Sequence, residues 1–370
     1  MAMEVELKKV GEQVLVITGA SSGVGLVTAK LAARRGARVV LAARNERDLE
    51  RAVEEIRREG GRAVFVVADV ADPAQVERIA RTAIDEFGRI DTWVNNAAVS
   101  MYGRIMDLSL DDMRRQFDVN YWGHVHGSRT AVPHLRKEGG ALINVASALA
   151  DRAIPLQGNY CAAKHAIKAF TDSLRMELEE EGAPVSVTLV KPGSIDTPFF
   201  EKAKTLFDVE PQPVPPVYAP EVVAETILHC AEHPVRDIVV SGMAKVIGMA
   251  NLVPRLADRY MERTTFDSQL TDIPVTADRK HNLYEPVEHD GGERGRTWKG
   301  RTKSTSLYTT AALHPELTAA AAAVGVGLLL AMRVRSRLRG DAPAASDDDR
   351  APGADGTTPA SYEERPIHSA

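Results

Sequence analysis

The sequence has few cysteines and lacks the features of a secreted protein. Only two cysteines, Cys161 and Cys230, occur among 370 residues. Two thiols exclude a disulfide framework and a cysteine-rich metal cluster, and they suit a reducing compartment. The opening segment MAMEVELKKVGEQ is charged and has no apolar stretch, so we expect no secretory signal. No internal repeat is visible. Together these absences predict a cytoplasmic protein.

The chain also lacks the excess of positive charge that is typical of nucleic-acid-binding proteins. Its formal net charge is −5, and residues 340–370 alone contain seven acidic and two basic side chains. The remaining body is therefore close to neutral, which argues against a nucleic-acid partner. His124, His126 and His134 have no further ligand at metal spacing, so we expect no metal site.

Short apolar segments alternate with amphipathic helical patterns over about the first 240 residues. Because the segments are almost wholly apolar, they are typical of strands in a parallel sheet that is covered on both faces. We therefore predict a doubly wound α/β fold with a parallel seven-stranded sheet and helices on both faces. The expected strands are residues 14–18, 38–43, 63–68, 91–96, 141–146, 185–190 and 237–241.

The regular pattern ends near residue 260, and we expect three segments after a folded domain of residues 1–260. Residues 261–310 are polar and become basic toward their end, which predicts an irregular extension. Residues 311–339 contain an apolar run at 317–332 with basic flanks. As a helix this run would be about 24 Å long, short of a hydrocarbon core of about 30 Å. A marginal membrane anchor and a helix that packs on the domain or a partner are both open. Residues 340–370 predict a disordered acidic tail.

A glycine-rich turn follows the first expected strand. In VLVITGASSGVG, the glycines Gly19, Gly23 and Gly25 stand where a chain turns tightly, approaches pyrophosphate and begins a helix. The N-terminus of that helix offers unpaired N–H groups to phosphates. The spacing G-x-x-x-G-x-G differs from the common dinucleotide fingerprint. We predict a dinucleotide site here, and a purely structural turn is the alternative.

The end of the second expected strand indicates the choice of cofactor. Folds that prefer NAD usually place an acid there to bind the ribose 2′-hydroxyl, whereas this chain has Ala43 followed by Arg44. A guanidinium binds the 2′-phosphate that an acid would repel. We predict NADP(H) rather than NAD(H), the alternative being that Arg44 is a solvated loop residue.

The segment NYCAAKH places Tyr160 and Lys164 four residues apart, on one face of an expected helix. Aromatic and cationic neighbours are common on helix surfaces. A cation about 5 Å away would, however, stabilise a phenolate by roughly 3 kcal/mol at an effective dielectric constant near 20. We expect Lys164 to lower the pKa of Tyr160 well below its usual value, so that the phenol can exchange a proton with a substrate oxygen.

These motifs resemble those of the short-chain dehydrogenase/reductase family. TGASSGVG follows the first expected strand, NNAAV follows the fourth and NYCAAK lies in a later helix. The resemblance covers about residues 10–245, with a C-terminal extension beyond it, and it implies a Rossmann-like fold and hydride transfer with a nicotinamide cofactor.

The resemblance implies four catalytic residues. Ser147, thirteen residues before the tyrosine, would bind the substrate oxygen. Tyr160 would be the general acid in carbonyl reduction and the base in alcohol oxidation. Lys164 would lower the pKa of the tyrosine and bind the nicotinamide ribose. Asn120, in FDVNYWG, would position a water that joins the lysine to solvent.

The resemblance also implies a set of cofactor-binding residues. Asp69 and Val70 would contact adenine, and the backbone near Ile195 and Thr197 would meet the nicotinamide carboxamide. Ala98 replaces the usual glycine of the family's NNAG motif, so we expect a modest loss of affinity. The full predicted set is Gly19, Ser21, Ser22, Gly23, Val24, Gly25, Arg44, Asp69, Val70, Asn96, Ala97, Tyr160, Lys164, Pro192, Gly193, Ile195 and Thr197.

In this family the substrate pocket is formed by loops after the fourth, fifth and sixth strands. Here these loops are mostly apolar and hold no arginine cluster, and the proline-rich segment 209–220 would form a semi-rigid lid. The expected lining residues are Met101, Tyr102, Leu149, Ile154, Leu156, Phe199, Phe200 and Phe207.

We therefore predict an NADP(H)-dependent oxidoreductase that transfers a hydride to or from a lipophilic carbonyl or secondary alcohol. The alternative is an NADP(H)-binding sensor or scaffold without turnover. The natural substrate, the direction of the reaction and association into a homo-oligomer stay open.

Overall fold

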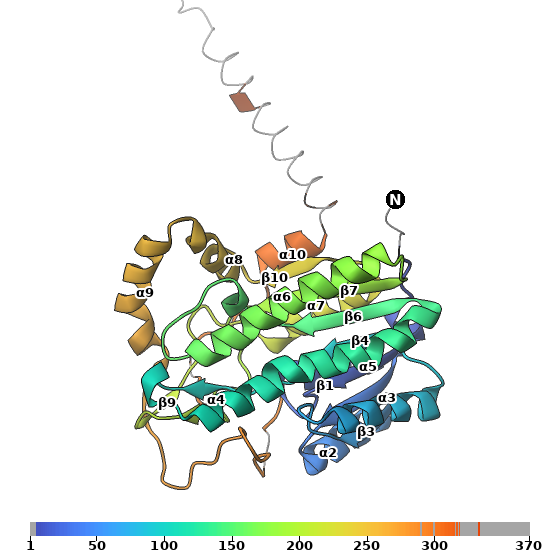
Figure 1. Ribbon diagram of the computed structural model, residues 1–370, viewed down its shortest axis with the longest axis horizontal. Coiled ribbons are helices and arrows are strands. Elements are labelled where there is room, and N and C mark those ends of the chain that lie inside the picture. Colours follow the sequence, from blue (N-terminus) through green and yellow to red (C-terminus); the bar gives the residue numbers. More distant parts are fainter. Residues whose placement is uncertain are drawn as a thin grey trace, which may run out of the picture. The chain divides into compact units, whose positions relative to one another are not determined.

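The computed structural model describes residues 5–288, 291–298 and 300–314, together with residues 316, 318, 332 and 333. Met1–Pro315 form one compact unit and Glu316–Ala370 a second. The first unit is a parallel sheet between two layers of helices (Figure 1). All elements named below belong to this first unit.

Seven parallel strands form the central sheet, in the order β10-β7-β6-β4-β1-β2-β3. This confirms the predicted doubly wound fold. Because β1 has β4 on one side and β2 on the other, the winding reverses there, and ligands of such sheets bind at the carboxyl ends beside this reversal. The strands are β1 (Val14–Thr18), β2 (Arg38–Ala43), β3 (Arg62–Val67), β4 (Thr92–Asn95), β6 (Gly140–Val145), β7 (Val185–Pro192) and β10 (Asp237–Val240).

Helices cover both faces of the sheet because successive side chains of a strand point to opposite faces. Leu15 and Ile17 of β1 pack in one core with α1 (Gly23–Arg34), α2 (Glu46–Arg58) and α7 (Pro220–Glu232). Val16 packs in the other core with α3 (Pro73–Phe87), α5 (Gly123–Glu138) and α6 (Gly158–Glu180), and Figure 1 shows α5 and α6 in front of the sheet.

Short elements complete this unit. The helix α4 (Leu110–Phe117) continues into α5 through a π-helical turn, η3 (Asp118–Trp122). Two further helices near the end are α8 (Gly242–Met249) and α10 (Leu307–Leu313). The 3₁₀ turns are η1 (Val10–Glu12), η2 (Ile105–Asp107), η4 (Ala148–Ala150) and η5 (Ala250–Leu252).

The chain beyond residue 260 is more regular than its sequence predicts. The helix α9 (Pro254–Ser268) crosses the expected domain boundary, and β11 (Leu270–Pro274) pairs antiparallel with β9 (Val209–Pro211). A second small sheet pairs β5 (Met101–Tyr102) with β8 (Lys204–Thr205). The buried residues of α9 are Ala257, Met261 and Thr265, a stripe too narrow to show in a periodicity search.

Two predicted C-terminal segments fall outside the described residues. These are the acidic tail at 340–370 and the apolar run at 317–332, apart from Thr318 and Met332. Among the residues that the structure describes, no helix combines the length and apolar character needed to span a membrane.

A buried polar network ties α5 and α6 to the middle of the sheet. The indole N–H of Trp93 donates to Asn95 Oδ1 at 2.8 Å, and Asn95 Nδ2 donates to Asn144 Oδ1 at 2.9 Å. Asn144 Nδ2 then donates to Thr171 Oγ1 on α6 at 2.9 Å. Gly127 of α5 completes the packing, because a Cβ at this position would lie only 2.0 Å from Asn95 Oδ1.

Replacing Gly127 with alanine should destabilise the fold. The added methyl group would displace Asn95, and such overpacking outweighs the gain of about 1 kcal/mol in helix propensity. We expect a net loss of about 1–2 kcal/mol of unfolding free energy in urea denaturation. Arg129→Ala, at an exposed position of the same helix, is the matched control. Equal stability of the two variants would show that the network tolerates the methyl group.

Candidate active site

The glycine-rich turn joins β1 to α1 at the carboxyl edge of the sheet. Gly19 and Gly23 have φ angles of +67° and +54°, a backbone conformation that favours glycine. A Cβ on Gly25 would lie 2.3 Å from the carbonyl oxygen of Gly19. Asn96, just after β4, donates from Nδ2 to the carbonyl of Thr18 at 3.0 Å and so holds the turn against the sheet.

A cavity of about 530 Å³ lies at this edge of the sheet. All residues of the predicted cofactor set except Gly25 line it, as does Ala98. Gly25 stands behind the turn, where it permits the close packing described above. The structure thus brings together residues from the ends of β1, β2, β4, β6 and β7, as a dinucleotide site in this fold requires.

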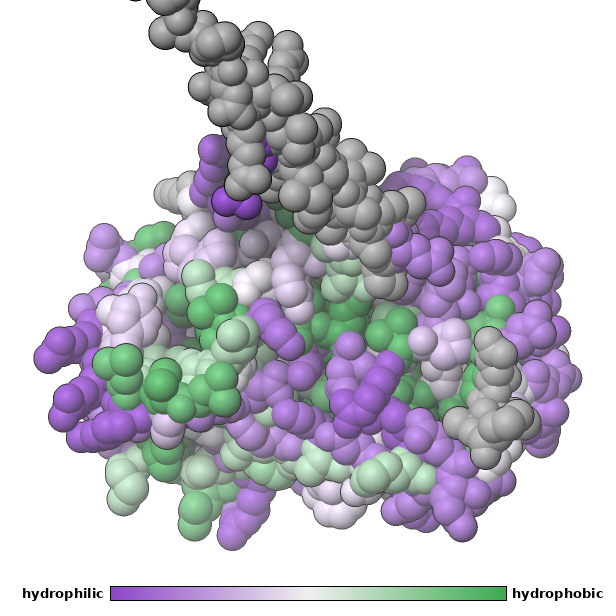
Figure 2. Space-filling model, turned by 90° about the horizontal axis from the view of Figure 1, so that it is seen from above, coloured by the Kyte–Doolittle hydropathy of each residue, from purple (hydrophilic) through white to green (hydrophobic). Residues whose placement is uncertain are grey.

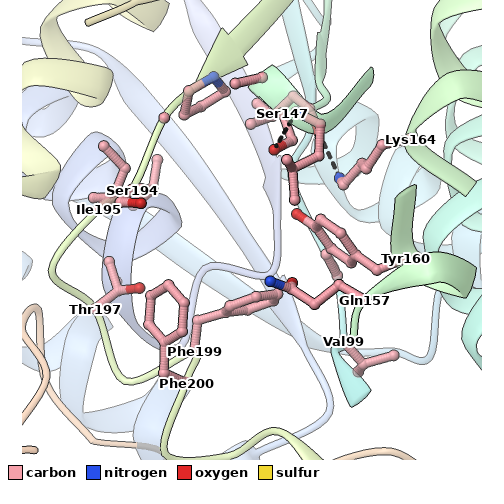
Figure 3. Close-up of a pocket in the computed structure, with 18 of the residues that line it drawn as sticks. Val99, Ser147, Gln157, Tyr160, Lys164, Ser194, Ile195, Thr197, Phe199 and Phe200 are labelled. Carbon is pink, nitrogen blue, oxygen red and sulfur yellow. Dashed lines mark hydrogen bonds between the residues drawn. The ribbon is translucent and has the colours of Figure 1, made fainter. Parts of the chain in front are cut away.

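Three of the four predicted catalytic residues meet at the cavity. Ser147 follows β6, and its Oγ accepts the backbone N–H of Leu149 at 3.1 Å. Tyr160 and Lys164 lie one turn apart on α6, and Figure 3 shows the Tyr160 hydroxyl directed toward the Ser147 side of the cavity. Lys164 Nζ donates to the carbonyl of Val145 at 3.0 Å and lies 5.5 Å from the centre of the Tyr160 ring.

The expected effect of Lys164 on Tyr160 is not found. Burial raises the pKa of Tyr160 above its usual value, since the phenolate would lose its hydration, and the hydrogen bond with Ser147 only partly opposes this. Burial also lowers the pKa of Lys164 to about 7, so its charge is weakened near neutral pH. Desolvation therefore outweighs the Coulomb interaction on which the prediction rested.

Asn120 has a different environment from the other three residues. It is fully buried in the π-helical turn η3. Its Nδ2 donates to the carbonyl of Val99 at 3.0 Å, and its Oδ1 accepts the N–H of Val99 at 2.8 Å. These contacts make Asn120 a brace for the chain after β4, where Val99 lines the cavity.

The two side chains expected at the adenosine end are both held by charged or polar partners. Asp69 forms an ion pair with Arg115 and accepts the N–H of Ala71 at 3.0 Å. Arg44 lines the cavity, and its Nη1 donates to the carbonyl of Tyr284 at 2.6 Å. The guanidinium of Arg44 is therefore more than a solvated loop charge.

Comparison with known proteins gives the family. The family model described as short chain dehydrogenase matches residues 13–206. The uncharacterized oxidoreductase YxnA of Bacillus subtilis is 49% identical over 323 residues, which cover 86% of this chain and 90% of YxnA. The chain belongs to the short-chain dehydrogenase/reductase family. It is therefore an oxidoreductase of that family.

Two solved structures resemble this short-chain dehydrogenase/reductase. A family member from Burkholderia phymatum in complex with NAD has a TM-score of 0.60 and 27% identity, covering 74% of this chain and 99% of its own. L-Sorbose reductase from Gluconobacter frateurii, complexed with NADPH and L-sorbose, has a TM-score of 0.55 and 26% identity. It covers 65% of this chain and 98% of its own. The likeness supports a nicotinamide cofactor. One of these two structures holds NAD and the other NADPH, so the comparison does not distinguish between them.

The predicted substrate lining is partly wrong. Leu149, Ile154, Phe199 and Phe200 line the cavity, whereas Met101, Tyr102, Leu156 and Phe207 are not among the described lining residues. Met101 and Tyr102 form β5, which pairs with β8 and points both side chains into packed surroundings. They were expected at the site because they follow β4 in the sequence. The pairing of β5 with β8 instead buries both side chains away from the cavity wall.

Part of the cavity wall comes from residues that no sequence motif indicates. Gln157 lines the cavity, and its Nε2 donates to Gln269 Oε1 at 2.8 Å. Further lining residues on α9 are Tyr260, Met261, Thr264, Thr265 and Ser268. No motif marks these residues, and only the weak amphipathic stripe of α9 could have drawn attention to them.

His124 lies under the same strand end as Lys164. It is 2% exposed, and its Nε2 lies 3.3 Å from the Val145 carbonyl that also accepts from Lys164. Burial, and to a lesser extent the nearby Lys164, lowers the pKa of His124 to about 3. The imidazole is therefore neutral in the folded protein at ordinary pH.

This burial should make the fold sensitive to acid. Between the usual histidine pKa and about 3, the unfolded chain binds a proton that the folded chain excludes, so stability falls as the pH drops through this window. When the pH falls from 7.5 to 4.5, the wild type should lose about 2–3 kcal/mol more of its unfolding free energy than His124→Asn does. Urea denaturation at both pH values measures this, with His165→Asn at an exposed position as control. Equal acid sensitivity of the wild type and His124→Asn would contradict it.

Proposed function

We propose that this protein is an NADP(H)-dependent oxidoreductase that interconverts a lipophilic carbonyl compound and the corresponding secondary alcohol. The main support is the meeting of Ser147, Tyr160 and Lys164 in one cavity with the glycine-rich turn. No member of this set is missing, which disfavours the alternative of a sensor or scaffold without turnover.

The chemistry follows from the positions of the three side chains. When bound, the nicotinamide supplies or accepts the hydride. In carbonyl reduction the Tyr160 hydroxyl donates its proton to the substrate oxygen. The Ser147 hydroxyl holds the same oxygen by a hydrogen bond. In alcohol oxidation the proton moves in the opposite direction.

The choice of NADP(H) rests on Arg44. Its guanidinium follows β2 and lines the cavity, and Ala43 stands where NAD-preferring relatives of this fold place an acid. A fixed positive charge at this point attracts a 2′-phosphate.

The preference for a lipophilic substrate rests on the apolar surface around the cavity. Met243 and Ile247 of α8 and Tyr260 of α9 line it, next to Phe199 and Phe200. Exposed apolar side chains continue outward on these helices, and Figure 2 shows apolar surface gathered on the left, the side on which Figure 1 places α8 and α9. An apolar rim favours entry of an apolar molecule. A cytoplasmic location, suggested by the low cysteine content, is part of this proposal.

Purified protein should oxidise NADPH with an apolar member of a carbonyl panel, and Tyr160→Phe should reduce kcat/KM by a factor of about 10²–10⁴. Tyr121→Phe, a tyrosine of η3 packed against Phe117 and Phe170, is the matched control and should keep full activity. Substrate disappearance and NADPH absorbance give the readout. Faster turnover of polar sugars than of apolar carbonyls would contradict the substrate class, and full activity of Tyr160→Phe would contradict the mechanism.

Arg44→Asp should shift cofactor preference toward NADH. The carboxylate would repel the 2′-phosphate and could accept the 2′-hydroxyl of NADH, so we expect the NADPH-to-NADH ratio of kcat/KM to fall by about tenfold or more. Steady-state kinetics with both cofactors measure the ratio. An unchanged ratio would remove Arg44 from cofactor selection.

A further inference from the structure

A stretch of the C-terminal chain crosses the cofactor half of the cavity. We call residues 279–288 and 291–298 the strap; in Figure 1 it belongs to the orange-brown segment at the lower side of the molecule. It lies beyond residue 206, where the match to the family model ends, so the family resemblance assigns it no role. Asn282 and Pro286 of the strap line the cavity together with Arg44 and Asn45.

At the adenosine end, side chains of the Rossmann-like core hold the strap by its backbone. Arg44 Nη1 donates to the carbonyl of Tyr284 at 2.6 Å, and Nη2 donates to that of Asn282. Asn45, the N-cap of α2, donates from Nδ2 to the carbonyl of Val287 at 2.8 Å. These carbonyls are neutral acceptors, and the two hydrogen bonds orient the guanidinium of Arg44.

At the phosphate end, the strap is fastened to the glycine-rich turn and to the outside of α1. The N–H of Gly23 donates to the carbonyl of Gly292 at 3.0 Å. Lys30 Nζ bridges Glu293 at 2.8 Å and Glu55 at 2.6 Å, and none of these three residues lines the cavity. The ion-pair anchor at Glu293 therefore lies outside the cavity, whereas the Gly292 carbonyl accepts the N–H of Gly23, which lines it.

Between these anchors, Asn282 lines the cavity. Its Oδ1 is buried and has no hydrogen-bond partner among the described residues, although its backbone N–H donates to the carbonyl of Lys202 at 2.9 Å. A buried acceptor without a partner is unfavourable unless a ligand supplies the donor. The amino group of adenine and the ribose hydroxyls are donors of the right kind for the space between Arg44 and Asp69.

We propose that the strap is a wall of the dinucleotide site and that Asn282 binds the adenosine half of the cofactor. This inference rests on the proposed function, since it requires that the protein bind NADP(H). The carbonyls of the strap hold the Arg44 guanidinium in position, and Asn282 contacts the bound nucleoside. The cofactor therefore lies between the Rossmann-like core and the strap.

The first test separates the two halves of the cofactor. Asn282→Leu, which keeps the size of the side chain but removes its polar atoms, should weaken NADPH binding to the full chain about fivefold. Binding of reduced nicotinamide mononucleotide, which lacks adenosine, should not change. Fluorescence of the reduced nicotinamide gives both affinities without turnover. Unchanged NADPH affinity, or an equal loss for both ligands, would overturn the role of Asn282.

The second test loosens the strap at its outer anchor. Glu293→Gln removes the ion pair with Lys30 and should weaken NADPH binding severalfold, while Glu59→Gln, which removes the exposed ion pair with Arg34 outside the strap, should not. Trypsin cleavage after the exposed Arg294 and Arg296 should be faster in Glu293→Gln, and NADPH should slow it.

Tighter NADPH binding by Glu293→Gln, or faster cleavage of the strap when NADPH is added, would show that the strap competes with the cofactor and would overturn the proposal. Wild-type protein that binds neither NADPH nor NADH would overturn the proposed function itself, and the strap inference with it.

Discussion

The burial of the Lys164 side chain is the constraint on which the geometry of the site depends. Only 1% of this residue is exposed, and its Nζ donates to the carbonyl of Val145, the last residue of β6. A buried amino group needs such a partner, so the helix α6 is held against the end of the strand. Tyr160 lies one turn earlier on α6, and Ser147 follows Val145 by two residues. One hydrogen bond thus relates all three side chains, and the Asn95–Asn144–Thr171 network holds the same helix to the sheet further along.

Burial also shifts the pKa values of the ionisable side chains around this hydrogen bond. Desolvation raises the pKa of Tyr160, lowers that of Lys164 to about 7 and lowers that of His124 to about 3, so each group is moved toward its neutral form. The part of the cavity around Tyr160 and Lys164 is therefore weakly charged near neutral pH, whereas Arg44 keeps a fixed charge at the end of β2.

The sequence predicted the features that depend on local pattern. The strands 14–18 and 38–43 match β1 and β2, because a buried parallel strand is visible as a continuous apolar run. The residues that converge on the cavity could be placed because strand ends share one edge of the sheet. The direction of the Tyr160 pKa shift could not be predicted. Spacing along a helix gives the distance to Lys164 but not the desolvation of the phenol. Met101 and Tyr102 were misplaced since the pairing of β5 with β8 joins segments about a hundred residues apart. The contacts of the strap have no sequence pattern at all, as its backbone carbonyls are the acceptors.

The cavity wall combines the region that matches the family model with residues that follow it in the chain. The region that matches the family model supplies Ser147, Tyr160 and Lys164, while residues after 206 add parts of α9 and of the strap to the cavity wall. Gln269, at the end of α9, accepts from Gln157 at the start of α6, so the later chain is tied to the helix that carries Tyr160. Only β11 and a short connection separate α9 from the strap. Because the 323-residue similarity to YxnA is far longer than the 206 residues up to the end of that match, it includes part of this later chain. Changes in this later chain would alter the cavity wall without displacing the three side chains whose positions depend on the burial of Lys164.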